Sequence, residues 1–202
     1  IEQAGSHFKA TEYPSLIDQL TKSADPAEPQ KPAVSLGTLK VVGAFHGLSR
    51  DRANARKFPS IDPHDSWSKY KGIIGQEAVD YAKGILAKGE NVRQMMKVVG
   101  EEGTSMEDFV VYLKAEFIDS VYLQQNGFDA VDAATIAERQ IYVFDKLVGS
   151  VLKKEFMFEE KEKARQYFYN LRQIFIDLNY APWGSVHFKE QEKKLDEYLA
   201  QA

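Results

Sequence analysis

Neutral amides and one aromatic ring stand together in the segment YLQQNGFDAVD, residues 122–132. The group consists of Gln124, Gln125, Asn126, Gly127 and Phe128. Amide side chains donate and accept hydrogen bonds but do not titrate near neutral pH, so they cannot serve as an acid or a base. They suit recognition instead, because an aromatic ring stacks on a purine base while amides and backbone groups meet the edge of that base. A simpler interpretation is a helix end whose amides cap exposed carbonyls and whose Phe128 packs inward.

The motifs of catalysis and metal binding are missing from the sequence. Its four histidines are scattered singly, and cysteine is absent, so no H-E-x-x-H or thiolate metal site exists. The chain has no G-x-S-x-G elbow, no G-x-x-x-x-G-K-[ST] loop and no G-x-G-x-x-G turn. The acidic pair Glu101 and Glu102 is typical of a solvated surface. The sequence therefore predicts no catalytic residue and no metal site.

Composition describes an ordinary globular chain. Of its 202 residues 44% are hydrophobic and 28% are charged, and the formal net charge is −4. This charge gives no reason to expect nucleic acid as a partner, since its binders are usually basic. No apolar run approaches the roughly 18 residues of a membrane helix, and no signal peptide opens the chain. We expect a cytoplasmic protein, and because Ile1 replaces an initiator methionine we expect it to be a piece of something longer.

The first third of the chain is rich in proline. Four prolines fall between residues 14 and 32, which predicts a long irregular connection with a helical turn at residues 15–21. The segment GTLKVVGAF, residues 37–45, predicts one short strand. A single strand cannot form a sheet. Residues 1–62 are therefore interpreted as the trailing edge of a sheet domain.

Helical signals dominate from Asp65 onward. Asp65 and Ser66 are good cap residues, and the segment 67–89 predicts one or two helices, followed by a short helix that ends at Gly100. Ser105 and Asp108 resemble a capping box before a further helix. Apolar residues at helical spacing then predict helices over 137–152, 161–179 and 188–200. The predicted fold is mainly α: a helical bundle domain at residues 63–202 that follows a partial α/β domain with one or two short strands.

The stretch ARKFPSIDPHDSWSKY, residues 55–70, is a second unusual feature. Its two prolines predict an extended turn that leads into a helix. Phe58 and Trp67 would then be core anchors at a joint between domains.

Together the two stretches resemble the catalytic A subunit of V-type and archaeal A-type rotary ATPases. The family pattern F-P-[SA]-I-[ND] stands here in FPSIDPHDSWSKY, and L-Q-Q-N-[AG]-F-D-x-V-D stands as LQQNGFDAVD. VVGEEGTSMEDFVVYLKAEFI between them is similar to the loop and helix that the family has there, and IEQAG at the start is similar to the family's E-R-A-G. The family's G-G-D-x-S-E-P segment is replaced by SADPAEPQKPAVS, in which only E-P is recognisable.

The resemblance implies a domain order and a nucleotide site. Residues 1–62 would be the C-terminal remnant of the nucleotide-binding domain, with a Pro-rich loop, and residues 63–202 the C-terminal helical domain. Gln125, Asn126, Gly127 and Phe128 would line the adenine pocket, with Phe58 on its other side. The phosphate loop, catalytic glutamate and magnesium ligands would lie upstream, so ATP or ADP with Mg would bind the full subunit. The isolated chain is expected to be inactive and to bind nucleotide only weakly.

The resemblance also implies partners. These are the B subunits of the hexameric head, one of which would supply an arginine finger, and the central rotor stalk, with Glu101, Glu102 and Met106 as candidate rotor-facing residues. The complex would couple ATP hydrolysis or synthesis to proton or sodium transport, with this subunit cytoplasmic and touching the membrane only through the complex. Two alternatives remain: a stand-alone helical interaction module, and a non-catalytic nucleotide-binding subunit of the same assembly.

Overall fold

The computed structural model describes residues 42–70 and 72–200. The chain divides into two compact units, Ile1–Val79 and Asp80–Ala202. The Pro-rich connection, the helical turn expected at residues 15–21 and most of the strand expected at 37–45 lie outside the described residues. A domain boundary after residue 62 stays a prediction.

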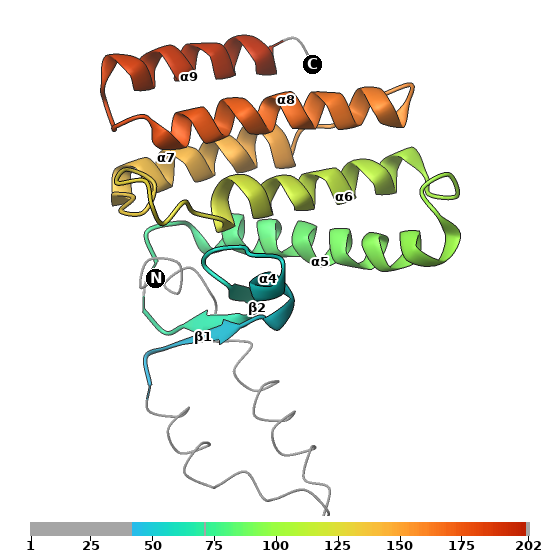
Figure 1. Ribbon diagram of the computed structural model, residues 1–202, viewed down its shortest axis with the longest axis horizontal. Coiled ribbons are helices and arrows are strands. Elements are labelled where there is room, and N and C mark those ends of the chain that lie inside the picture. The colour runs from blue at the N-terminus through green and yellow to red at the C-terminus, as the bar shows by residue number, and fades with distance from the viewer. Residues whose placement is uncertain (1–41, 71, 201–202) are drawn as a thin grey trace, which may run out of the picture. The chain divides into compact units, whose positions relative to one another are not determined.

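The described part of the first unit is built around a β-hairpin. Strand β1 (Ala44–Leu48) pairs antiparallel with β2 (Ile61–Ser68), and helix α4 (Arg50–Asn54) lies between them in the chain (Figure 1). Ser49 begins α4 because its side chain accepts a hydrogen bond from the backbone N–H of Arg52. The ring of Trp67 is fully buried and stacks on Phe45 opposite it, with 6.3 Å between centroids.

The predicted helix start at Asp65 is wrong, because residues 61–68 form strand β2. Asp62, inside this strand, accepts at its carboxylate from the backbone N–H of His64 and of Asp65 at 2.8 and 3.2 Å. These bonds lie at the register shift between the pairs Phe45–Trp67 and Gly47–Asp62, and they start no helix. The buried Ser66 hydroxyl accepts from Gly47 N at 3.0 Å, and the backbone pairs with β1. Pairing with a strand some twenty residues earlier therefore overrides the local cap signal.

Helices make up the second unit, and α5 begins four residues before the boundary between the units. Two helices end in a π-helical turn: η2 extends α6, and η3 extends α7. Their bounds are α5 Gln76–Val99, α6 Met106–Ile118, η2 Asp119–Leu123, α7 Ala137–Leu147, η3 Val148–Leu152, α8 Lys161–Tyr180 and α9 Val186–Leu199. These elements confirm the mainly helical fold with a small two-stranded sheet.

Helix α5 corrects a further prediction. It begins at Gln76 and runs unbroken to Val99, where a helix from Trp67 and a separate short helix had been expected. Gly89 does not interrupt it, and a Cβ there would lie 2.2 Å from the Cβ of Ala115 on α6. Glycine at this position lets two helices approach closely. The predicted end at Gly100 is confirmed, and that residue takes a positive φ of 78°.

Helix α8 contributes a stripe of buried apolar residues to the core. It packs against both α6 and α9 (Figure 1). Its predicted apolar stripe is buried, and Phe175 meets Phe117 edge to face at 5.1 Å between centroids. The buried members of the stripe are Ala164, Phe168, Leu171, Phe175 and Leu178. None of the helices in the described ranges is long and apolar enough to cross a membrane.

Candidate functional site

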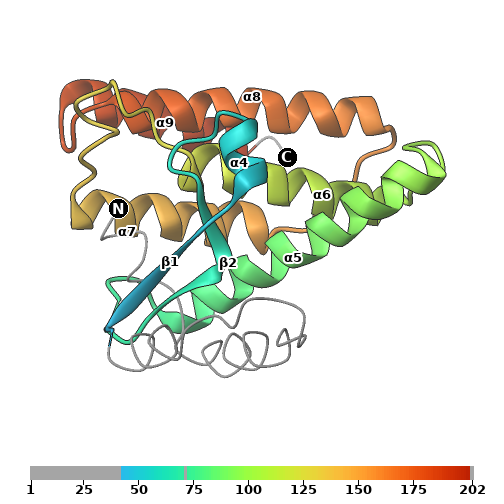
Figure 2. The ribbon, with the colours of Figure 1, turned by 60° about the horizontal axis from the view of Figure 1, so that its bottom comes forward.

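The candidate recognition segment is the connection from η2 to α7, residues 124–136, which we call the amide loop (yellow between α6 and α7 in Figure 2). The loop leaves η2 at Gln124, whose N–H donates to Asp119 O at 2.9 Å. The last turn before it is fixed to α8, because Asn179 donates from Nδ2 to Val121 O at 2.7 Å. The start of the loop therefore has a defined position on the helical unit.

Asp132 closes the amide loop from inside. Its carboxylate accepts from Asn126 N at 2.6 Å, and its backbone oxygen accepts from Gln125 Nε2 at 3.1 Å. The residue is only 8% exposed. Burial raises the pKa of the Asp132 carboxyl above its ordinary value, although the Asn126 N–H and the positive charge of Arg139 act in the opposite direction.

Asp129 and Asn126 fix the backbone around the aromatic ring. The Asp129 carboxylate accepts from Val131 N at 2.9 Å and from Asp132 N at 2.8 Å. The Asn126 side-chain oxygen accepts from Phe128 N at 3.1 Å, and its backbone oxygen accepts from Asp129 N at 3.2 Å. Short-range bonds of this kind let Asn and Asp residues build a turn without a helix or a strand.

Arg139 anchors the amide loop to α8. Its side chain is 2% exposed and donates to Val131 O at 3.3 Å and to Leu178 O at 3.1 Å. Burial lowers the pKa of this guanidinium, while the negative charges of Asp132 and Asp129 oppose that shift. A second, longer contact joins Asn126 Nδ2 to the Tyr180 hydroxyl at 3.4 Å. The loop is thus tied to the C-terminal end of α8.

This framework presents the ring of Phe128 to solvent. Phe128 is fully exposed, at 102%, so the interpretation in which it packs inward is wrong. Gln124 and Gly127 are exposed as well, whereas Gln125 and Asn126 are half-buried. The Asn126 amide is engaged in the structure of the loop itself, through Phe128 N and Tyr180. A hydrogen-bonded loop with an uncovered aromatic face is suited to stacking on a flat ligand.

Phe58 belongs to the other compact unit. It lies between α4 and β2, and its side chain is 51% exposed. That its ring faces Phe128 across a ligand stays a prediction.

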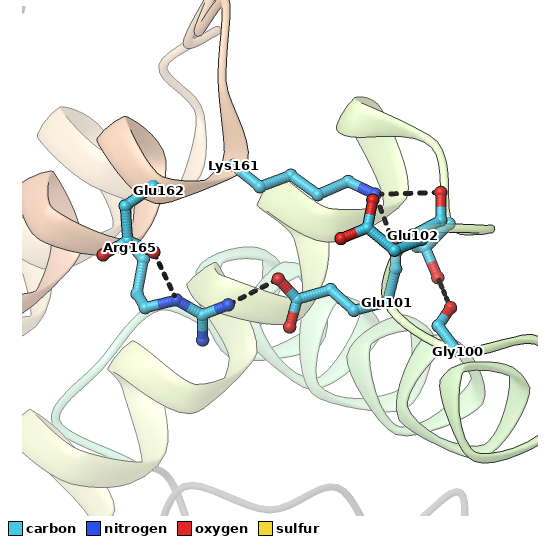
Figure 3. A network of polar contacts seen from close by, with 7 residues as sticks. Gly100, Glu101, Glu102, Lys161, Glu162 and Arg165 are labelled. Carbon is cyan, nitrogen blue, oxygen red and sulfur yellow. Dashed lines mark hydrogen bonds and ion pairs between the residues drawn. The ribbon is translucent and has the colours of Figure 1, made fainter.

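The acidic turn, residues 100–105, joins α5 to α6 and is held by α8 (Figure 3). Arg165 Nη2 and Glu101 Oε1 form an ion pair at 2.5 Å, which raises the pKa of the guanidinium. Lys161 Nζ donates to the backbone oxygens of Glu101 and Glu102 at 2.5 and 3.4 Å. The carboxylate of Glu101 is therefore used within the chain. Glu102 is exposed, and Met106 is half-buried.

Sequence reasoning missed the apolar residues beside the acidic turn. Val98 is 86% exposed, Val99 51% and Met95 39%, all on the last turns of α5. A signal existed, because Val98 stands six residues after the buried Val92 and so falls off the buried face of the helix. Over residues 42–70 and 72–200, no three His, Asp or Glu side chains are grouped so that they could hold a metal ion.

Comparison with known proteins finds similarity to ATP synthase subunits. Residues 76–167 match a family described as the C-terminal domain of V and A type ATP synthase. The chain is 53% identical over 168 residues to a V-type ATP synthase alpha chain of Treponema denticola, and 54% identical over 166 residues to one of Borrelia duttonii. These matches cover 83% and 82% of this chain but 28% and 29% of the relatives, so it spans less than a third of their length.

Among solved structures, the chain is similar to an ATP synthase subunit, NeqB, of Nanoarcheaum equitans. That similarity has a TM-score of 0.49 at 21% identity and covers 63% of this chain and 33% of the other, which is too weak to bear on function. The sequence matches confirm the predicted resemblance: this chain is similar to the C-terminal part of V-type ATP synthase alpha chains.

Proposed function

We propose that this chain, similar over most of its length to V-type ATP synthase alpha chains, supplies the adenine side of a nucleotide site in a rotary ATPase. The complete catalytic subunit would couple ATP hydrolysis or synthesis to proton or sodium transport. The described residues offer recognition groups in this role rather than a nucleophile, a base or a metal site. Phosphoryl transfer, with Mg, would be performed by other parts of the full subunit.

The observation that carries the proposal is the uncovered ring of Phe128 on a loop fixed by its own hydrogen bonds. A loop backbone that is already held in place loses little conformational entropy when a ligand stacks on the ring it carries. Stacking of a base on an aromatic side chain contributes about 1–3 kcal/mol in single-stranded nucleic-acid binders. A planar base is therefore a ligand to which this loop is well suited.

The neighbouring residues would complete the adenine pocket. Gly127 is exposed and has no side chain to block the approach of a base to the backbone. Gln125 and Asn126 would act mainly by shaping the loop, because the side chains of both make hydrogen bonds within it. Phe58 would supply the opposite wall.

The partners that fit this role are the B subunits of the hexameric head and the central rotor stalk. Glu101, Glu102 and Met106 remain the candidate residues for rotor contact. Their turn is braced by Lys161 and Arg165, and the exposed valines at the end of α5 stand beside it. The subunit would be cytoplasmic and peripheral, reaching the membrane only through the complex.

The test is Phe128→Ala in the assembled ATPase that contains the full-length subunit. Loss of about 1–3 kcal/mol of stacking corresponds to a KM for ATP about 5- to 150-fold higher. The kcat should stay nearly unchanged, because stacking on adenine is equal in the ground and transition states.

A matched control is Met157→Ala, since Met157 is also almost fully exposed, at 97%, but lies between η3 and α8. This control should leave both kinetic constants unchanged. A wild-type KM in the Phe128→Ala enzyme would contradict the adenine assignment. It would favour the alternative function, a helical interaction module.

A further inference from the structure

We propose that Asp132 is a positioning residue: its buried carboxylate holds the amide loop in the one conformation that presents Phe128 to the ligand. The nature of that ligand rests on the proposed function, whereas the positioning itself rests on the contacts within the loop. Asp132 touches no ligand in this scheme, and its carboxylate acts through the backbone of Asn126.

The first step is the closure of the loop. Asp132 Oδ2 accepts from Asn126 N at 2.6 Å, and Asp132 O accepts from Gln125 Nε2 at 3.1 Å. One residue thus receives donors from two consecutive residues on the opposite limb of the loop. These bonds join the start of the loop, at Gln125 and Asn126, to its later part at Asp132, and we call this junction the neck. Phe128 lies on the segment between the joined residues.

The second step leads from Asn126 to the ring. Asn126 accepts from Phe128 N at its side-chain oxygen and from Asp129 N at its backbone oxygen, at 3.1 and 3.2 Å. The backbone at and after the ring is therefore bonded to Asn126, which is itself held by Asp132. Phe128 is fully exposed, so no packing contact of its own holds it. The direction in which its side chain leaves the backbone depends on this chain of hydrogen bonds.

The third step gives the loop its orientation on the helical unit. Val131, next to Asp132, is joined through Arg139 to the end of α8 at Leu178. The neck of the loop is therefore fixed in space as well as closed. The anchor at Arg139 also supplies a positive charge near the Asp132 carboxylate, which is largely withdrawn from water.

The chemistry separates a positioning role from a charge role. Asparagine at position 132 would keep an acceptor oxygen for Asn126 N–H while removing the negative charge. Alanine would remove the acceptor and leave a half-buried N–H without its partner. The pair Asp132→Asn and Asp132→Ala therefore distinguishes hydrogen bonding from electrostatics at one site.

The first measurement is amide hydrogen exchange on the full chain. With Asp132→Ala, exchange at Asn126 and Phe128 should be at least about tenfold faster, because this variant lacks the hydrogen bond that closes the loop. With Asp132→Asn it should stay within about threefold of the unmodified chain. The amide of Phe175, in the core of α8, serves as the internal control for the fold. Unchanged exchange at Asn126 and Phe128 in Asp132→Ala overturns the proposal.

The second measurement is the KM and kcat for ATP of the assembled ATPase. Asp132→Ala should raise the KM at least about fivefold with kcat within about twofold, and Asp132→Asn should restore the KM. If exchange accelerates but the KM stays unchanged while Phe128→Ala raises it, Asp132 does not position the ring for its ligand. If neither Asp132→Ala nor Phe128→Ala changes the KM, the adenine assignment fails. Faster exchange in Asp132→Ala would still establish that Asp132 orders the loop.

A further variant guards against loss of the fold. Should Asp132→Ala also expose the Phe175 amide, Asp132→Glu takes its place, because it keeps the charge but moves the carboxylate by one methylene group. The KM should then rise several-fold without faster exchange in the core. A KM equal to that of the unmodified enzyme overturns the proposal.

Discussion

Replacing Gly89 with alanine should destabilise the helical unit, although alanine is the better helix former. Gly89 is buried on α5, where a Cβ would lie 2.2 Å from the Cβ of Ala115 and 3.5 Å from Val111 O on α6. Gly84, on the same helix, is exposed, and a Cβ there would meet nothing within 4 Å. The two positions therefore give the same substitution in the same helix with opposite surroundings.

The magnitudes follow from two opposing effects. Alanine in place of glycine within a helix is favourable by up to about 1 kcal/mol, so Gly84→Ala should stabilise the chain by about 0.5–1 kcal/mol. Gly89→Ala gains the same propensity, but its methyl group falls more than 1 Å short of an ordinary carbon–carbon contact of 3.5–4.0 Å. Overpacking of this kind costs about 1–3 kcal/mol. The net expectation is a loss of up to about 2.5 kcal/mol, in place of the gain expected at Gly84.

The assay is thermal and urea unfolding of the full chain, followed by far-ultraviolet circular dichroism. For a chain of this size 1 kcal/mol shifts Tm by about 2–4 °C, so the two variants should move Tm in opposite directions. Adding Ala115→Gly to Gly89→Ala should recover part of the loss, because it removes the clashing methyl group. A Tm for Gly89→Ala that rises as it does for Gly84→Ala would refute the close approach of α5 and α6.

Two further predictions concern pH and salt. Burial raises the pKa of Tyr167 to about 12 from 10.0, so the folded chain holds that proton longer than the unfolded chain and stability falls as pH rises from 10 to 12. Tyr167→Phe should remove part of this fall in the free energy of unfolding, and an unchanged pH profile would contradict the assignment. Glu101→Gln removes the partly exposed ion pair with Arg165 and should cost less than about 1 kcal/mol at low salt and almost nothing at 0.5 M salt. A loss that persists at high salt would show that the ion pair is not its cause.

Local signals in the sequence were sufficient for most of the helices. Ser105 does cap α6, since its hydroxyl accepts from Asp108 N at 3.1 Å, and Gly100 does end α5. The apolar spacing of α8 identified residues that are buried. These predictions succeeded because caps and helical periodicity depend on residues within a few positions of one another. The family resemblance, carried by two short motifs, is confirmed by the sequence matches.

The sequence-based predictions of secondary structure were wrong where contacts with a distant part of the chain determined the structure. Cap residues before Trp67 predicted a helix, but the backbone of β1 was available for pairing and drew residues 61–68 into a strand. A separate short helix was expected before Gly100, yet α5 runs unbroken through Gly89, which lies close against Ala115 of α6. In both cases the competing contact comes from more than ten residues away, and single-sequence patterns do not report such contacts.

The sequence by itself places amides, a glycine and an aromatic ring side by side in one short segment, and it predicts a recognition role for them. Only the tertiary structure decided how they are used. Leu178 lies 39 residues from Arg139 in the chain, yet the bond between them fixes the amide loop on α8. The carboxylate of Asp132 closes that loop, and Phe128 is left fully exposed. Burial and hydrogen-bond partners are properties of the folded chain, because they depend on which distant segments the core brings together.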